Sequence, residues 1–162
     1  MARAFIGIGS NEGDRLAFIS KAVQALASLS EIRVTQMALI SESEPVGGPP
    51  QGPYLNTVVE LETLLTPSVL LGRLKAIEGQ LGRKPAAQRW TSRPIDLDVL
   101  LYDDLVLQDP ALTIPHPRMH ERRFVLEPLA QLAPQIVHPV LKQPITALLE
   151  RLPGGVSRPV SP

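Results

Sequence analysis

Strict alternation of apolar and polar residues marks the most informative stretch of the chain. After Pro94 the sequence alternates from residue 95 to residue 99, which is the period of a β-strand with one face in the core. Side chains two apart on a strand point the same way, so Asp96 and Asp98 share one face. Their Cα atoms would lie about 6–7 Å apart at the usual rise per residue. The opposite, core-facing side carries the apolar residues Ile95, Leu97, Val99 and Leu101.

Similar patterns predict the other regular elements. Runs of apolar and β-branched residues predict strands over 4–9, 32–42 and 54–62. Acidic Asp103-Asp104 predicts a turn, after which residues 105–107 would return as a hairpin. Apolar residues at helical spacing, with capping residues and proline near their starts, predict helices from Asn11 or Asp14 to Leu29-Ser30, from Thr66-Pro67 to Gly82, from Glu127-Pro128 to Leu132, and from Ile145 to Leu152.

The order of these elements predicts an α+β fold. Strand, helix, strand, strand, helix, strand is the β-α-β-β-α-β order of a ferredoxin-like antiparallel sheet. Helices would cover one face of that sheet, and the additional C-terminal helices would cover the other, giving three layers, α/β/α. We expect a single domain over residues 1–152 and a flexible tail over residues 153–162.

Composition narrows the class of protein. The 162 residues are 44% hydrophobic, yet no apolar run approaches the ~20 residues that span a bilayer. The start of the chain resembles a core strand rather than a signal peptide, so we expect a cytoplasmic protein without a membrane partner. The formal net charge of zero argues against a general nucleic-acid binder. The absence of cysteine excludes disulfides and thiolate chemistry.

The aspartate pair is the first candidate site. Two close carboxylates repel each other, and a hard dication such as Mg²⁺ removes that cost. A solvated strand face is the commoner explanation of an Asp-x-Asp pattern, but Leu100 and Tyr102 continue this face, so it is not uniformly polar. Basic residues that could hold a polyphosphate come just before the pair, at Arg83, Lys84, Arg89 and Arg93. The residues alone therefore predict a site for Mg²⁺ and a polyphosphate.

Two further stretches carry candidate binding residues. His116 lies between two prolines, which exclude it from a helix core, and Arg122 and Arg123 could reach phosphate. Phe124 could stack on a flat ring, although a place in the core is the commoner role. Asn56 offers both a donor and an acceptor to a heterocycle, and satisfying loop backbone is an equally good explanation. The proline- and glycine-rich residues 43–53 are either functional or disordered.

Taken together, these motifs resemble the 6-hydroxymethyl-7,8-dihydropterin pyrophosphokinases of folate biosynthesis. The resemblance extends to about residue 152, and its most specific part is the Arg-x-x-Asp-Leu-Asp core that begins at Arg93. The ordered motifs are Gly9-Ser10-Asn11, Glu44-Pro45-Val46-Gly47, Tyr54-Leu55-Asn56, Arg89-Trp90, Ile95-Asp96-Leu97-Asp98, Pro115-His116-Pro117 and Arg122-Arg123-Phe124.

The resemblance implies transfer of pyrophosphate from ATP to the pterin hydroxymethyl group, with release of AMP. It implies that Asp96 and Asp98 hold two Mg²⁺ ions and that Arg83 and Arg93 join them in catalysis. The pterin would be held by Ser43, Pro45, Val46, Tyr54, Asn56 and Phe124. ATP would contact Glu78, Arg83, Arg89, Trp90, Arg93, His116 and Arg122, with Trp90 in a lid loop. ATP and the pterin would be the partners of a monomeric enzyme.

Some features depart from this pattern or leave alternatives. Thr91-Ser92 stands where relatives often have Gly-Pro, and residues 84–88 hold fewer basic residues than in some relatives, which could weaken lid closure. One alternative is a different two-metal nucleotidyl or phosphoryl transferase, whose third acidic ligand would be Glu60 or Glu62. Another is a module that binds a small molecule without catalysis or Mg²⁺.

Overall fold

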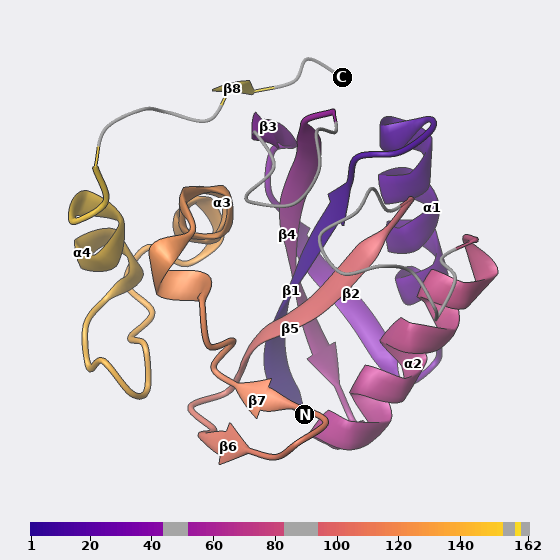
Figure 1. Ribbon diagram of the computed structural model, residues 1–162. Helices are drawn as coiled ribbons and strands as arrows, with labels where there is room; N and C mark the ends of the chain where they lie inside the picture. Colours follow the sequence, from indigo (N-terminus) through magenta and orange to yellow (C-terminus); the bar gives the residue numbers. More distant parts are fainter. Residues whose placement is uncertain (44–51, 83–93, 154–157, 160–162) are drawn as a thin grey trace.

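The computed structural model describes residues 1–43, 52–82, 94–153 and the backbone of residues 158–159 (Figure 1). It is a mixed α/β fold with an antiparallel sheet and flanking helices. The elements in chain order are β1 (Ala2–Ser10), α1 (Arg15–Ala27), β2 (Ile32–Met37), β3 (Ser41–Ser43), β4 (Tyr54–Thr63), α2 (Pro67–Gln80), β5 (Asp96–Tyr102), β6 (Leu107–Gln108), β7 (Thr113–Ile114), the 3₁₀ turn η1 (Met119–Glu121), α3 (Arg123–Leu132), α4 (Ile145–Glu150) and β8 (Arg158–Pro159).

The main sheet has six strands in the order β5-β1-β4-β3-β8, and β2 pairs with β4 beside β3. Neighbouring strands in this sheet are antiparallel. Strand β1 is therefore central, while β5, which carries the aspartate pair, lies at an edge. This order places residues from three distant parts of the sequence side by side at one end of the sheet.

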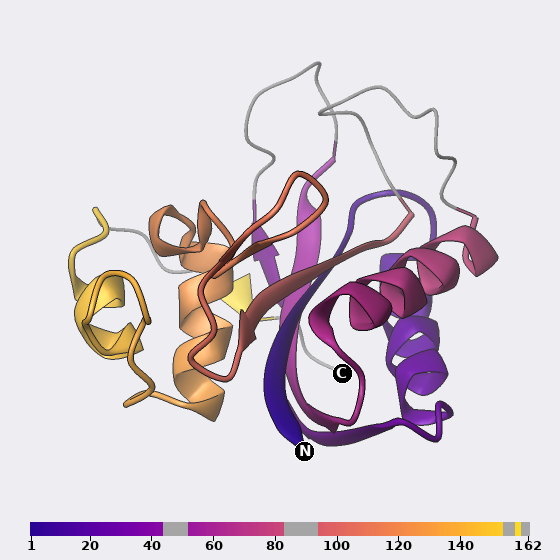
Figure 2. The ribbon, with the colours of Figure 1, turned by 90° about the horizontal axis from the view of Figure 1, so that it is seen from below.

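Two apolar clusters cover opposite faces of this sheet. Alternate residues of β1 divide between them: Ala4, Ile6 and Ile8 join the cluster that contains the buried faces of α1 and α2. Phe5 joins the other cluster, together with Val58 and the buried residues of α3 and α4. Figure 2 shows α1 and α2 on one side of the sheet, and α3 and α4 on the other. The period of two predicted from the sequence is thus matched by burial on both faces.

The two long helices begin where their capping residues predict. The Asp14 carboxylate accepts the N–H of Ala17 at 3.1 Å and so caps α1. Helix α2 begins at Pro67, directly after Thr66, and it buries Leu70, Leu74, Ile77 and Glu78. Gly82 follows α2 with φ of 97°, a left-handed conformation that suits glycine at a helix end. In the described part of the chain, no helix is both long and apolar enough to cross a membrane.

Three details differ from the sequence-based expectation. The expected strand over 32–42 is two strands, β2 and β3. Leu107–Gln108 pairs with β7 instead of returning along β5, so the predicted hairpin is wrong. Helix α3 begins at Arg123 rather than at Glu127, and Pro128 lies inside it. The helix tolerates this proline because Val125, Leu126, Pro128 and Leu129 bury a common face, and that packing outweighs the lost backbone hydrogen bond.

A short strand also forms near the C-terminus. Arg158–Pro159 pairs with β3, opposite Glu42 and Ser41. The strand lies within the segment that the sequence predicts to be a flexible tail. Flexibility of the remaining tail residues stays a prediction.

Leu126→Ala tests the contribution of α3 to the fold. Leu126 is fully buried against the sheet, so its truncation should cost about 2–5 kcal/mol of unfolding free energy. The matched control is Leu64→Ala, because Leu64 is 73% exposed and its truncation should change stability by only about 0.5 kcal/mol. Urea unfolding of both variants checks the difference. Equal losses would show that α3 packs more loosely than the structure indicates.

Candidate active site

Strand β1 brings the two halves of the candidate site together. Gly9 pairs with Asp96 of β5 on one side and with Asn56 of β4 on the other. Residues paired across antiparallel strands point to the same face, so Asp96 and Asn56 face the same way about 10 Å apart, across a residue without a side chain. A Cβ atom on Gly9 would lie 3.1 Å from Asn56 Oδ1. Glycine at this position therefore leaves the space between Asp96 and Asn56 free of a side chain.

The aspartate pair lies as its alternation predicts. Asp96 and Asp98 are partly buried on one face of β5, while Leu97 and Val99 are buried in the core on the other. Asp98 pairs with Gly7, so the second carboxylate also lies beside a glycine of β1. The prediction that the two carboxylates share a face at the start of this strand is confirmed.

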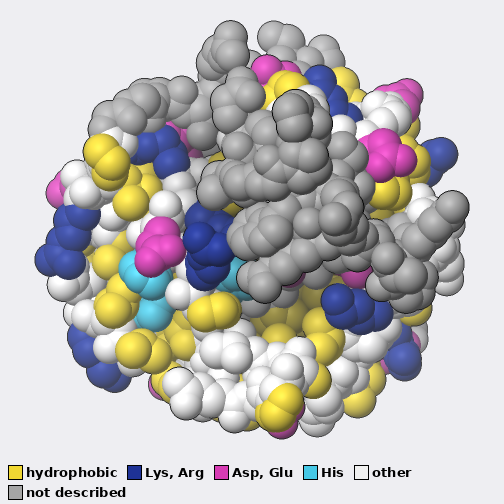
Figure 3. Space-filling model, viewed as in Figure 1, with side chains coloured by type: hydrophobic (Ala, Val, Ile, Leu, Met, Phe, Trp, Pro, Cys, Tyr) yellow, Lys and Arg dark blue, Asp and Glu magenta, His cyan; other side chains and the backbone are white. Residues whose placement is uncertain are grey.

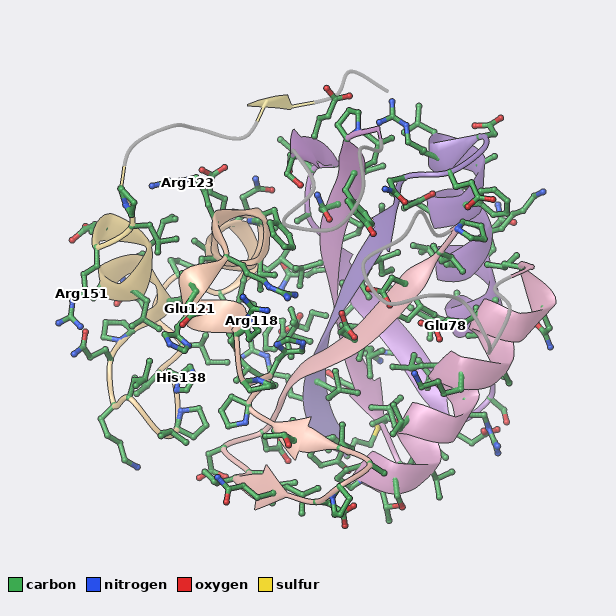
Figure 4. All side chains as sticks on the ribbon, viewed as in Figure 1. Glu78, Arg118, Glu121, Arg123, His138 and Arg151 are labelled. Atoms are coloured by element: carbon green, nitrogen blue, oxygen red, sulfur yellow. The ribbon has the colours of Figure 1, made fainter. Side chains whose placement is uncertain are left out.

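A third carboxylate, Glu78 of α2, caps the edge of β5. Its Oε2 accepts the backbone N–H of Leu97, the residue between the two aspartates, at 2.7 Å. Among the described strands β5 lies at the edge of the sheet, so none of them pairs with this N–H on that side. Glu78 is only 3% exposed, and the ammonium of Lys75 lies 3.8 Å from its Oε1. In Figure 4, Glu78 lies between α2 and β5. It therefore fixes the start of β5, a role that residue pattern alone does not reveal.

Burial and neighbouring carboxylates disfavour the ionised form of Asp98. Burial, the neighbouring Asp96 and then Glu78 raise the pKa of Asp98 from its usual 3.8 to about 7. The charges of Arg122 and Lys75 act in the opposite direction but do not offset this rise. Such a crowded set of carboxylates suits a bound dication, which would stabilise their ionised forms.

His116 and Arg122 are two further polar side chains that interact electrostatically with the aspartate pair. The His116 backbone N–H donates to the carbonyl of Leu100 at 2.9 Å, which anchors this segment to β5. Burial and the charge of Arg122 lower the pKa of His116 to about 4, so the ring is neutral at pH 7. Its Nδ1 accepts the N–H of Arg118 at 3.2 Å, which assigns the ring proton to Nε2. Figure 3 shows histidine and basic side chains gathered over η1 and the start of α3.

Arg122 itself lies between this polar group and an aromatic ring. Burial and the charge of Arg118 lower its pKa, while Asp98 and Asp96 act to raise it. Its guanidinium carbon lies 5.5 Å from the centre of the Phe124 ring, within the range of a cation–π contact. Phe124 is partly buried and packs against the second apolar cluster, so it has both core contacts and an exposed part.

The asparagine half of the site is pre-oriented by a neighbouring strand. Asn56 Nδ2 donates to Ser43 Oγ at 2.7 Å, and Asn56 is 6% exposed. Ser43 pairs with Tyr54, whose ring would lie 3.5 Å from a Cβ atom on Gly9. Three residues expected to hold the pterin therefore lie together at the β3–β4 end of the sheet.

Other candidates lie apart from the site or outside the described residues. Arg123 donates to Glu127 at 3.0 Å and to the carbonyl of Leu152 at 3.2 Å, and Figure 4 shows it beside α4 rather than toward β5. Residue pattern alone had predicted that either Arg122 or Arg123 could reach phosphate. The expected site residues that lie outside the described part of the chain are Pro45, Val46, Arg83, Arg89, Trp90 and Arg93, together with the departures at 84–88 and Thr91-Ser92.

The third acidic ligand expected for a different two-metal enzyme is engaged elsewhere. Glu60 interacts with Arg3, Thr35 and Gln36. Glu62 lies 3.7 Å from Arg33. Within residues 1–43, 52–82 and 94–153, no group of three His, Cys, Asp or Glu residues is placed to hold a metal ion. Mg²⁺ is usually held by one or two carboxylates together with substrate phosphates and water, so it suits the aspartate pair.

The family model for 7,8-dihydro-6-hydroxymethylpterin-pyrophosphokinase (HPPK) matches residues 5–134. The chain belongs to this family. A pyrophosphokinase of this kind from Aquifex aeolicus is 38% identical over 145 residues, covering 90% of this chain and 89% of the relative. Another, from Bacillus subtilis, is 42% identical over 133 residues, covering 82% of this chain and 79% of the relative. The resemblance drawn from the motifs, and with it the expectation of a pyrophosphokinase of folate biosynthesis, is confirmed.

Solved structures of the family agree on the fold. The Plasmodium falciparum HPPK-DHPS structure with pteroate superposes with a TM-score of 0.74 at 15% identity, covering 93% of this chain. The chain spans only 42% of that solved protein, so the comparison concerns one part of it.

Asp98→Asn tests the electrostatics of the site through the pH dependence of stability. Without divalent cations, folded Asp98 keeps its proton up to about pH 7, whereas the unfolded chain releases it near 3.8. The folded state binds more protons in this window, so the Asp98 contribution lowers the free energy of unfolding as pH rises. Asparagine removes that contribution, and the variant should gain stability relative to the parent between about pH 5 and about pH 8.

Urea unfolding at both pH values measures this difference. Asp104→Asn, at an exposed turn residue, is the matched control and should show no such gain. An Asp98→Asn curve parallel to that of the parent would contradict the raised pKa of Asp98.

Proposed function

We propose that this chain transfers pyrophosphate from ATP to the hydroxymethyl group of 6-hydroxymethyl-7,8-dihydropterin, giving AMP and the pterin diphosphate. The observation that carries the proposal is the register across Gly9, which sets Asp96 and Asn56 on one face of the sheet. A group that recognises the pterin heterocycle and a group that holds Mg²⁺ and the ATP phosphates would then bring the two substrates together on one face of the sheet. Family membership supports ATP as the co-substrate.

The acidic half would hold two Mg²⁺ ions through Asp96 and Asp98. Bound there, Mg²⁺ would polarise the phosphoryl group and lower the pKa of the attacking hydroxyl. Glu78 keeps the backbone between the two aspartates in place. Phosphoryl transfer depends mainly on such positioning and on charge stabilisation, so the site needs no covalent nucleophile.

Arg122 and His116 would contact the phosphates of ATP. Arg122 supplies a fixed positive charge, and neutral His116 supplies a hydrogen-bond donor at Nε2 without adding charge. On sequence grounds we add Glu78, Arg83, Arg89, Trp90 and Arg93 to the ATP-binding set, with Arg83 and Arg93 also aiding catalysis.

The pterin would lie between Asn56 and Phe124. Because Ser43 accepts one Asn56 amide hydrogen, the asparagine carbonyl is held in a fixed orientation toward an incoming ring. The exposed part of Phe124 offers an aromatic face for stacking. Tyr54 completes this group, and Pro45 and Val46 join it on sequence grounds.

We assign the fold to the ferredoxin-like class, with three α/β/α layers. The strand order β5-β1-β4-β2 supports this assignment, as do the helices on both faces. The monomeric state, the cytoplasmic location and the single domain over residues 1–152 stay predictions.

Product analysis tests the proposed reaction. The protein is incubated with ATP, Mg²⁺ and the pterin alcohol, and the nucleotides are then separated. AMP formed only in the presence of the pterin is the expected result. ADP would instead indicate a kinase that transfers one phosphoryl group. No turnover, with pterin binding that does not need Mg²⁺, would indicate a binding module.

Asp98→Ala is the matched variant in the same assay. Turnover should fall by at least about a thousandfold, because a metal ligand and its charge are lost together. The fold should persist, since the change also relieves repulsion between carboxylates. Activity that survives at saturating Mg²⁺ would rule out a metal role for Asp98.

Phe124→Ala tests the ring-stacking role. Pterin affinity should fall about tenfold or more, because an aromatic stacking contact and its buried area are lost. ATP affinity should change little. Titration of each ligand separately measures the two affinities. Equal losses for both ligands would mean that Phe124 serves only the core.

A further inference from the structure

Arg15 joins three segments that meet beside the pterin-binding residues. Its Nη1 donates to the backbone carbonyl of Pro53 at 2.8 Å and lies 3.5 Å from Glu42 Oε2. Pro53 directly precedes β4, and Glu42 is the middle residue of β3. One guanidinium nitrogen thus contacts β3 and the residue just before β4, at the end where Ser43 and Tyr54 lie opposite each other.

The position of Arg15 in its own helix gives it no local advantage. Arg15 is the first residue of α1, and the first turn of that helix contains no acidic residue. A cation at a helix N-terminus faces the positive end of the helix dipole, which is unfavourable. The contacts with Pro53 and Glu42 are therefore a better reason for an arginine here than the stability of α1.

A second contact from the same corner supports this arrangement. Asn11, in the turn between β1 and α1, donates from Nδ2 to the carbonyl of Gly52 at 3.3 Å. The β1–α1 corner thus binds two successive carbonyls, those of Gly52 and Pro53, just before β4 begins. Tyr54 and Asn56 follow at once, and Asn56 in turn bonds Ser43 across the strands.

We infer that Arg15 is a positioning residue for the pterin, acting by clamping Glu42 and Pro53 so that Ser43, Tyr54 and Asn56 keep their relative placement. This inference rests on the proposed function, because it names how the pterin half of that site is held. Arg15 does not touch the substrate. Its effect is confined to the β3–β4 end of the sheet, so it bears on the pterin and not on ATP.

Arg15→Ala separates these two effects. The KM for the pterin should rise about tenfold, the equivalent of one lost hydrogen bond from a charged donor, while the KM for ATP and kcat change by less than about twofold. Arg15→Lys should recover most of the loss, since an ammonium can also donate to the Pro53 carbonyl. The matched control is Arg33→Ala, which removes a 73%-exposed arginine from the Glu62 pair and should leave both KM values unchanged.

A second variant tests the inference even if Arg15→Ala does not fold. Glu42→Gln keeps the contact between Arg15 and Pro53 but removes the negative charge at residue 42. The pterin KM should then rise about threefold, which is the effect expected for loss of an exposed ion pair. An unchanged pterin KM in the folded variants would overturn the inference, as would equal rises for pterin and ATP. Failure of the proposed function is distinguishable, because the parent protein itself would then form no AMP.

Discussion

The register of β1 between β4 and β5 is the constraint on which the rest of the site depends. Gly9 fixes which residues lie across from each other, and it leaves no side chain between Asp96 and Asn56. A shift of one residue along either pairing would turn one of these groups into the apolar cluster of α1 and α2. The buried alternation on both faces prevents such a shift.

Electrostatics at the edge of the sheet follows from this placement. On the edge strand β5, the backbone N–H of Leu97 donates to Glu78. This contact places a third carboxylate close to Asp98. Burial and Asp96 raise the pKa of Asp98, and Glu78, which holds β5 in place, adds to this rise and so favours a dication. On the other side, Arg122 balances part of this charge and also contacts the ring of Phe124. The halves that we propose for phosphate and for pterin are thus linked by one arginine.

Local pattern predicted most elements because their signals are local. Asp14 and Pro67 marked the starts of α1 and α2, and alternation located β1, β4 and β5. Pattern misplaced the start of α3, where burial of one helix face outweighed a proline. It also paired residues 105–107 with β5, because nothing in a short apolar run specifies its partner.

The sequence by itself determined the family, the aspartate pair and the residue types that we propose for the two substrates. Such features are read from neighbours along the chain, or from an ordered set of motifs. Only the tertiary structure decided that Arg123 pairs with Glu127 and with the carbonyl of Leu152 beside α4, that Glu78 caps β5, and that Arg15 links β3 to the residue before β4. Each of these depends on contacts between segments far apart in sequence, and spacing along one chain carries no record of such contacts.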